Sequence, residues 1–295
     1  MKINIVTVSS GWILQKISER TAQACNEKID GYTMTVSHIA DPKADVNYYA
    51  DLQNCYGGQK TKCDVAYFTH ADLNSPDWLR NLLNNTKSFE NLDGIISMNG
   101  RYTNMLRNIG WTKPLSTITP GETKDMFPLR KITIGVVSRG GYPGYGQHFM
   151  ENMLNTYDFK NFKLKFLGNG WGNLKHISNR KDYDLELIGD SDYRVYPSFY
   201  QNIDYLLIPG LWTAGPISFQ EALSTGTPVI SANIGFAGYE LYPDYMFEPN
   251  DVNGLSRILD TIQEPYKKRR SQVENMTWEN YAIDVIKFIE EIKNG

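Results

Sequence analysis

Cysteine is scarce in this sequence of 295 residues: only Cys25, Cys55 and Cys63 occur, and none has the spacing of a metal ligand. A small, odd number of cysteines disfavours a disulfide framework and is typical of reduced thiols in the cytoplasm. Long apolar runs are also lacking, since none approaches the ~20 residues that a membrane span requires. The first residues, MKINIVTVSS, show no signal-peptide layout. We therefore expect a soluble, cytoplasmic protein without a membrane span.

An excess of basic residues is absent as well. The chain has 30 basic and 33 acidic residues and a net charge of −3, whereas proteins dedicated to nucleic acids usually present a basic surface to the phosphates. Nucleic acid is thus a disfavoured but open class of partner. The strong basic cluster at 267–270 is typical of a solvated surface segment.

Short β-branched runs alternate with helical patterns along the chain, which is typical of parallel α/β architecture. In the first half we expect strands at 3–8, 34–39, 65–69, 94–98 and 114–118, and helices at 13–27, 76–90 and 101–110. In the second half we expect strands at 131–138, 162–168, 185–189, 204–209 and 228–232, and helices at 147–156, 217–225, 251–263 and 277–293. A linker rich in Pro, Gly and charge separates the halves at 119–131.

These patterns predict an α/β fold with two Rossmann-like domains facing a cleft. We expect an N-terminal domain at 1–122 and a C-terminal domain at 123–295, with the last helix, 277–293, packing back on the first domain. Ligands of open parallel sheets bind outside the carboxyl ends of the strands. The loops that follow the strands are therefore the candidates for chemistry.

The segment LWTAGPISFQEALSTGTPVI, residues 211–230, contains such a loop. A strand ends at Pro209, a loop follows at 210–216, and a helix begins near Ile217 or Ser218. The free amides and the positive dipole of a helix start favour an anion. Glu221, one turn into the helix, can accept hydrogen bonds from vicinal hydroxyls such as those of ribose. This arrangement suits a nucleoside diphosphate, although a plain strand–loop–helix unit has the same pattern.

The longer segment IPGLWTAGPISFQEALSTGTPVISANIG resembles the donor-binding segment of retaining nucleotide-sugar glycosyltransferases of the GT-B fold, the glycosyl transferases group 1 or family 4-like enzymes. The resemblance extends through most of the chain. FLGNGWG (166–172) is similar to the family's Gly-x-Gly loop near the nucleotide base, and IGVVSRGGYPGYG (134–146) to the loop that faces the diphosphate. YMFEPNDVNGLSRIL (245–259) resembles the entry to the family's closing helix.

This resemblance implies roles for particular residues. Glu221 matches the second glutamate of the family's pair, which is associated with the donor ribose, whereas Thr213 stands where the first glutamate usually lies. Arg139 matches an arginine directed at the diphosphate, but Gly144 or Tyr145 replaces the lysine that follows it. The implied donor-binding residues are Gly11, Arg139, Gly140, Tyr145, Gly168, Asn169, Thr213, Ala214, Gly215, Pro216, Ile217, Ser218 and Glu221.

In the first domain, the resemblance implies that His70, at the end of a predicted strand, contacts the donor sugar near the reacting centre. His70, Arg139 and Glu221 are then the candidate catalytic residues. Asp72 and Trp12 are candidates for the acceptor side. A histidine at a strand end is otherwise more often structural, and Trp12 also suits a helix anchor in the core.

The family implies transfer of a sugar from a nucleoside diphosphate sugar to a hydroxyl acceptor, with retention at the anomeric carbon and without a metal or another cofactor. Three alternatives stay open. The chain could be a nucleotide-sugar epimerase, or a nucleotide-sugar binder without catalysis, which Thr213 and the missing lysine would explain. The acceptor could also be a modified DNA base. The nucleotide, the sugar, the acceptor and the oligomeric state are not specified by the sequence.

Overall fold

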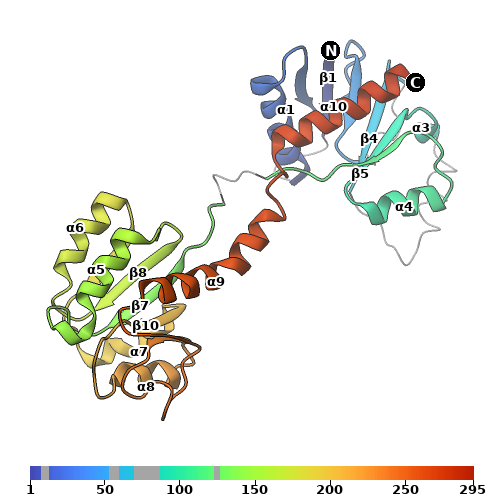
Figure 1. Cartoon of the computed structure of the whole chain (residues 1–295). Coiled ribbons are helices and arrows are strands. Elements are labelled where there is room, and N and C mark those ends of the chain that lie inside the picture. Colours follow the sequence, from blue (N-terminus) through green and yellow to red (C-terminus); the bar gives the residue numbers. More distant parts are fainter. Residues whose placement is uncertain (8–12, 53–59, 70–86, 123–126) are drawn as a thin grey trace. The chain divides into compact units, whose positions relative to one another are not determined.

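The computed structural model describes residues 1–7, 13–52, 60–69, 87–122 and 127–295. It divides the chain into two compact units (Figure 1). The first contains Met1–Phe127 together with Gln272–Gly295, and the second contains Pro128–Ser271. The first unit is thus closed by the C-terminal segment of the chain, and the second is inserted between its two parts.

The first unit is built on a parallel sheet of six strands in the order β2-β1-β3-β4-β5-β6. Its strands are β1 (Lys2–Val6), β2 (Thr33–Ser37), β3 (Val46–Tyr49), β4 (Asp64–Phe68), β5 (Gly94–Ser97) and β6 (Leu115–Thr117). Every residue of β3, β4 and β5 is buried. Such two-sided burial explains why these strands are largely apolar rather than alternating; their polar residues Asn47, Asp64 and Ser97 are buried too.

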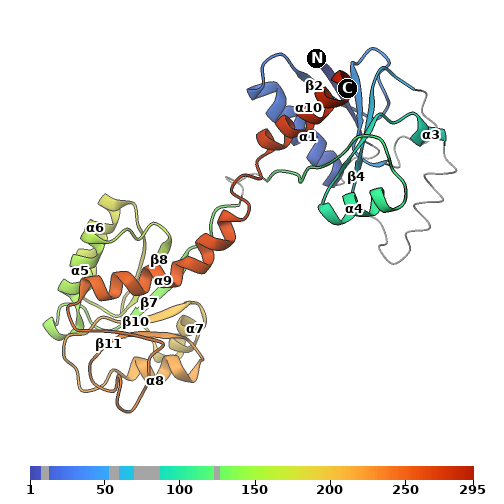
Figure 2. The same cartoon turned by 45° about the vertical axis from the view of Figure 1, so that its right-hand side comes forward.

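Helices flank this sheet. The described ones are α1 (Ile13–Lys28), α3 (Lys87–Glu90), α4 (Gly100–Asn108) and α10 (Trp278–Asn294). Figure 2 shows α10 beside α1 on the sheet of the first unit. Lys28 of α1 pairs with Glu279 of α10 at 2.9 Å, and the buried side chains of α10 join the core of the first unit. The amphipathic sequence of α10 thus covers a sheet that is distant from it along the chain.

The second unit has a parallel sheet in the order β12-β11-β10-β7-β8-β9. Its strands are β7 (Ile132–Val137), β8 (Phe162–Leu167), β9 (Asp184–Ile188), β10 (Tyr205–Ile208), β11 (Val229–Ala232) and β12 (Tyr245–Phe247). From β7 the chain proceeds outward to β8 and β9, and then returns to β10 on the other side of β7. The strand order therefore reverses between β7 and β10, and their loops diverge there.

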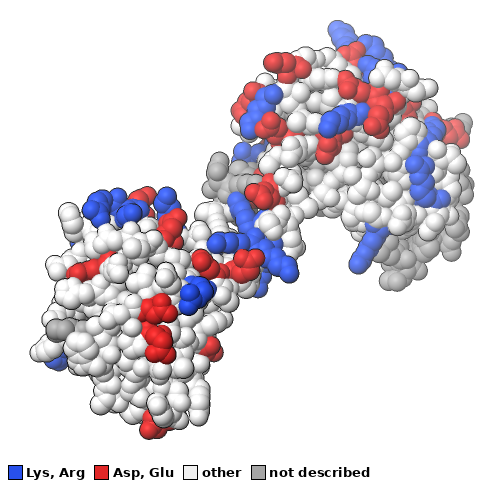
Figure 3. All heavy atoms as spheres, viewed as in Figure 1, with Lys and Arg blue, Asp and Glu red and all other residues white. Residues whose placement is uncertain are grey.

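The helices of the second unit surround a single large core. They are α5 (Gln147–Thr156), α6 (Gly172–Lys181), α7 (Tyr196–Gln201), α8 (Ile217–Ser224) and α9 (Val252–Ser271), with short 3₁₀ turns η2 (Pro143–Tyr145) and η3 (Tyr193–Val195). On the face seen in Figure 3, acidic and basic side chains are mixed, and basic ones gather over the end of α9, where Lys268, Arg269 and Arg270 form its last turn. Within the described part of the chain, no helix is both long and apolar enough to cross a membrane.

The two parallel six-stranded sheets with flanking helices confirm the predicted fold class of two Rossmann-like units. The boundary differs in detail from the predicted 122/123: the first part of unit one ends at Phe127, and residues 272–295 belong to unit one. The predicted helix at 76–90 lies outside the described residues except for α3. Strands β3 and β12 and helices α6 and α7 were not expected from the sequence, because they are short or polar.

Candidate functional site

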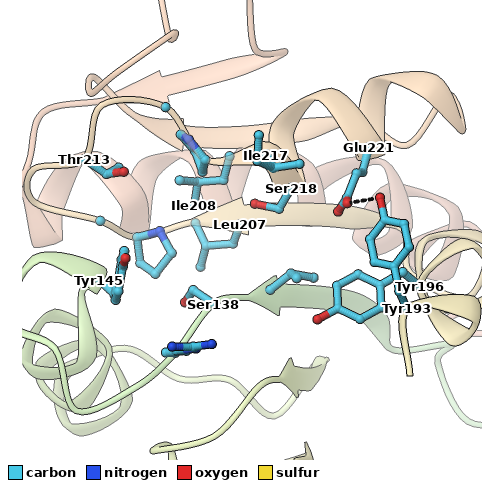
Figure 4. Close-up of a pocket in the computed structure, with 16 residues that line it drawn as sticks. Ser138, Tyr145, Tyr193, Tyr196, Leu207, Ile208, Thr213, Ile217, Ser218 and Glu221 are labelled. Atoms are coloured by element: carbon cyan, nitrogen blue, oxygen red, sulfur yellow. Dashed lines mark hydrogen bonds between the residues drawn. The ribbon is translucent and has the colours of Figure 1, made fainter. Parts of the chain in front are cut away.

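A pocket of about 480 Å³ lies at the carboxyl ends of β7 and β10, where the strand order of the second unit reverses (Figure 4). Open parallel sheets bind ligands at this kind of point. The pocket is lined by Val137, Ser138, Arg139, Tyr145, Tyr193, Tyr196, Leu207, Ile208, Pro209, Gly210, Thr213, Gly215, Pro216, Ile217, Ser218 and Glu221. Thr213 and Tyr145 lie at one end, and Glu221 lies at the other with Tyr193 and Tyr196 (Figure 4).

The start of α8 forms one wall of the pocket. Pro216 is its N-cap, with an extended backbone (φ −74°), and makes no side-chain cap. Proline fixes the entry angle and offers no side-chain acceptor to the first amides of the helix. The amides at Ile217 and Ser218 and the positive end of the helix dipole are therefore available to an anion in the pocket.

Two ionisable side chains of opposite charge line the pocket, apart from its tyrosines: Arg139 and Glu221. Arg139 lies two residues after the end of β7 and is exposed. Its guanidinium can form two parallel hydrogen bonds to a phosphate. The pocket thus combines a cation and a helix start with a carboxylate, which suits a ligand that carries both an anionic group and hydroxyls.

The Gly-rich turn after β7 packs against the loop after β8, next to the pocket. Gly140 lies against the backbone of Gly170, and its amide donates to the Asn169 carbonyl at 2.7 Å. The amide of Gly141 donates to the Gln147 side chain. The Ser138 hydroxyl lines the pocket, is buried, and has no hydrogen-bond partner among the described residues. A buried hydroxyl without a partner is uncommon.

Two tyrosines hold the carboxylate of Glu221. Tyr193 donates to Oε1 at 2.6 Å, and Tyr200 donates to Oε2 at 2.5 Å. The hydrogen bond to Glu221 raises the pKa of the exposed Tyr193 phenol. Burial, and then the hydrogen bond to Glu221, raises the pKa of Tyr200 strongly. Both phenols are therefore neutral donors at physiological pH, and both carboxylate oxygens are engaged.

The structure brings together many of the residues that the sequence predicted for donor binding. Those that line the pocket are Arg139, Tyr145, Thr213, Gly215, Pro216, Ile217, Ser218 and Glu221. Gly140, Gly168, Asn169 and Ala214 are not among the lining residues. Gly168 and Asn169 lie in the loop after β8, where the Asn169 amide pairs with the carboxylate of Asp190. His70, Asp72, Gly11 and Trp12 lie outside the described residues.

Sequence reasoning missed the aromatic end of the pocket. Tyr193 and Tyr196 line it, with ring centroids 5.0 Å apart. Tyr200 does not line the pocket, but its hydroxyl donates to Glu221. The signal was the spacing in YRVYPSFY (193–200), which repeats tyrosine at three and then four residues. On a helical segment this spacing places all three rings on one face.

Comparison with known proteins agrees with this location. Residues 133–277 match the family described as glycosyl transferases group 1. The match begins in β7 and ends at the N-cap of α10, so it covers nearly the whole second unit and its pocket.

Similar structures include HepE from Anabaena in complex with UDP-glucose, at 12% identity over 100% of this chain and 98% of that one, with a TM-score of 0.41. Sucrose-phosphate synthase from Thermosynechococcus elongatus is similar at 12% identity over 100% and 98%, with a TM-score of 0.41.

A curated relative is protein CapJ of Staphylococcus aureus, which is 24% identical over 139 residues. The matched region is 44% of this chain and only 35% of that protein, so the chain matches about a third of its relative's length. Residues 133–277, slightly less than half of the chain, thus form a domain that matches the glycosyl transferases group 1 family.

Proposed function

We propose that the protein is a glycosyltransferase that moves a sugar from a nucleoside diphosphate sugar to a hydroxyl acceptor. The observation that carries this proposal is the pocket at the reversal of strand order. It unites Arg139, the start of α8 and Glu221 within the segment that matches the family.

In this proposal the diphosphate binds between Arg139 and the first amides of α8. Negative charge grows on the diphosphate as the bond to the sugar breaks, and fixed donors that face this charge stabilise the transition state more than the ground state. The ribose hydroxyls bind the Glu221 carboxylate at the other end of the pocket. The nucleotide is then held at two chemically distinct points, which orients the bond that must break.

We further propose that transfer proceeds with retention and without a metal or another cofactor. Arg139 and the helix amides supply the positive charge that a cation would otherwise provide. The departing phosphate oxygen takes the proton of the acceptor hydroxyl, so that no separate base is required. His70 is proposed to contact the sugar, and Asp72 and Trp12 the acceptor, on the family resemblance of the sequence alone.

A second candidate function is nucleotide-sugar binding without transfer. Thr213 lines the pocket at the position where the resemblance places a glutamate close to the reacting sugar. A hydroxyl in place of that carboxylate removes a charge from the sugar end. A protein of this kind would bind the donor and release no nucleotide.

One experiment tests the proposal and separates the two candidates. The protein is mixed with UDP-, GDP-, ADP- and dTDP-sugars in EDTA, and both the thermal shift and the release of free nucleotide are measured. A donor at about 100 times its Kd stabilises by about 2.7 kcal/mol, which is several degrees for a protein of this size. A shift with nucleotide release supports transfer, and a shift without release, in the presence of a broad acceptor panel, supports binding alone. If no donor produces a shift, the proposed function is wrong.

The shift is expected to disappear in Arg139→Gln. The matched control is Arg180→Gln, because Arg180 is also exposed in the second unit but contacts Asn155 and does not line the pocket.

A further inference from the structure

The two tyrosines that hold Glu221 are not equivalent. Tyr200 is 1% exposed and packs edge-to-face on Phe199 in the core of the second unit. Its carbonyl accepts a hydrogen bond from the Thr227 hydroxyl at 3.1 Å, which ties it to the end of α8. Tyr200 therefore cannot leave Glu221 without disturbing the core.

Tyr193 is in the opposite situation. It is 66% exposed and begins the short 3₁₀ turn η3, which contains no buried residue. Its ring contacts that of Tyr196 in a tilted arrangement. A surface side chain on such a turn changes rotamer within nanoseconds, at the cost of one exposed hydrogen bond.

The Tyr193 hydroxyl occupies the position beside Glu221 at which a ligand hydroxyl would bind. Tyr193 and Glu221 line the main pocket, and the dashed line in Figure 4 marks their hydrogen bond at its end. The phenol of Tyr193 covers Oε1, the carboxylate oxygen that does not accept the hydrogen bond of Tyr200. Any hydroxyl that is to bind Oε1 from the pocket competes with the phenol for it.

A second hollow beside the main pocket could accommodate the Tyr193 side chain. This hollow of about 380 Å³ adjoins the main pocket, and both are lined by Tyr193, Tyr196, Ile217 and Glu221. Beyond this shared wall, the second hollow is bordered by α7 and by the polar residues Gln220, Ser224 and Thr225. A phenol can therefore turn out of the main pocket and still meet polar partners.

We propose that Tyr193 is a displaceable stand-in for a ribose hydroxyl: it covers Oε1 of Glu221 and gives way when the ribose of a nucleotide binds there. Tyr200 keeps its bond to Oε2 throughout and positions the carboxylate. This inference rests on the proposed function, because it takes the ligand to be a nucleoside diphosphate. The exchange replaces one hydroxyl donor by another. The hydrogen bond of Tyr193 therefore lowers the apparent affinity for the nucleotide, because the ribose can bind Oε1 only in those molecules in which this hydrogen bond is open.

The test compares nucleotides with and without ribose hydroxyls. Calorimetric titration identifies which of UDP, GDP and ADP binds the wild type, and that nucleotide is then compared with its 2′,3′-dideoxy counterpart. Tyr193→Phe keeps the ring and removes the competing phenol, so the ribonucleotide is expected to bind about threefold more tightly, in line with the loss of one exposed hydrogen bond. The dideoxy nucleotide is expected to bind both proteins equally, because it leaves the Tyr193–Glu221 bond in place.

Two further variants complete the design. Tyr239→Phe is the matched control, because Tyr239 is also exposed in the second unit but lies outside the pocket, and it is expected to change neither affinity. Tyr200→Phe is expected to weaken ribonucleotide binding while leaving the dideoxy nucleotide unaffected, since the carboxylate is no longer held in one orientation.

The outcomes are distinct. If Tyr193→Phe leaves ribonucleotide affinity unchanged or weakens it, or if it strengthens both nucleotides equally, the stand-in role is wrong while the proposed function stands. If none of the three diphosphates binds the wild type, this inference fails, and the proposed function fails as well if none of the four nucleotide sugars gives a thermal shift.

Discussion

Gly146 lies so close to Pro209 that a Cβ atom on the glycine would be 2.1 Å from the proline carbonyl oxygen. A further contact joins the same two loops: the Leu211 amide donates to the Gly144 carbonyl at 2.8 Å. The loop after β7, which carries Arg139, is thereby fixed against the loop after β10, which leads to α8. The shape of the pocket depends on this contact, because one loop supplies its cation and the other its helix start.

Gly146→Ala is therefore expected to damage both stability and binding. Gly146 has a φ of 87°, which strains any residue with a Cβ by roughly 1–3 kcal/mol, and the overlap with Pro209 adds to this. We expect a melting temperature several degrees lower and loss of nucleotide binding, measured by thermal denaturation and titration. Gly172→Ala is the control, since nothing lies within 4 Å of its added Cβ at the start of α6. Equal melting temperatures in the two variants would contradict the role of Gly146.

The C-terminal helix is expected to stabilise the first unit and not the second. Ile289 of α10 is 0% exposed within the core of the first unit, and Leu259 of α9 is equally buried in the core of the second. Truncating a buried Ile or Leu to Ala costs about 2–5 kcal/mol. Hydrogen exchange should therefore accelerate in β1 peptides for Ile289→Ala and in β7 peptides for Leu259→Ala. Acceleration in the same peptides for both variants would refute this division.

The sequence allowed prediction of the parts of the fold with strong local signals. Strands β7 and β10 are apolar runs that end in a Gly-rich or a Gly/Pro loop, and α8 has both a proline entry and Gly226 after its end. These signals are local, so they can be recognised in the sequence without knowing which segments are adjacent in the fold. Together with the family resemblance, which assigned Arg139, they predicted Arg139 and Glu221 as donor-binding residues, and both line the pocket.

Other parts depend on contacts between distant segments and could not be predicted. Strand β12 has three residues and is recognisable only by its pairing with β11. Helix α6 has a polar sequence with two buried residues, so its periodicity is weak. The contact of Tyr193 with Glu221 joins residues that are 28 positions apart, and it depends on side-chain rotamers that no pattern encodes.

Cys63 predicts a pH dependence of stability. Burial, and then the charge of Asp93, raises the pKa of its thiol to about 11, against 9.0 for an unperturbed thiol. Between these values the unfolded chain loses its proton while the folded chain keeps it. This contribution is therefore complete below about pH 9 and is lost as the pH rises through about 11.

Urea unfolding at pH 8 to 11 measures this loss by comparing the wild type with Cys63→Ala. The gap in unfolding free energy between the two proteins is expected to narrow as the pH rises, by at most about 1.4 kcal/mol per pH unit. The comparison removes the titration of the lysines and tyrosines, which both proteins share. A gap that stays constant over this range would show that the thiol does not titrate differently in the folded state.

Arg139 allows the binding of phosphate to be separated from the binding of the rest of the nucleotide. Arg139→Lys keeps the positive charge but loses the planar fork, so we expect about tenfold weaker binding of a nucleoside diphosphate, whereas Arg139→Gln loses the charge as well and should weaken it by about a hundredfold. Added salt should weaken the wild type more steeply than Arg139→Gln, because salt screens the interaction of exposed charges. The free nucleoside, which has no phosphate, should bind all three proteins alike. If the nucleoside also binds the variants poorly, Arg139 acts by shaping the pocket and not by meeting the diphosphate.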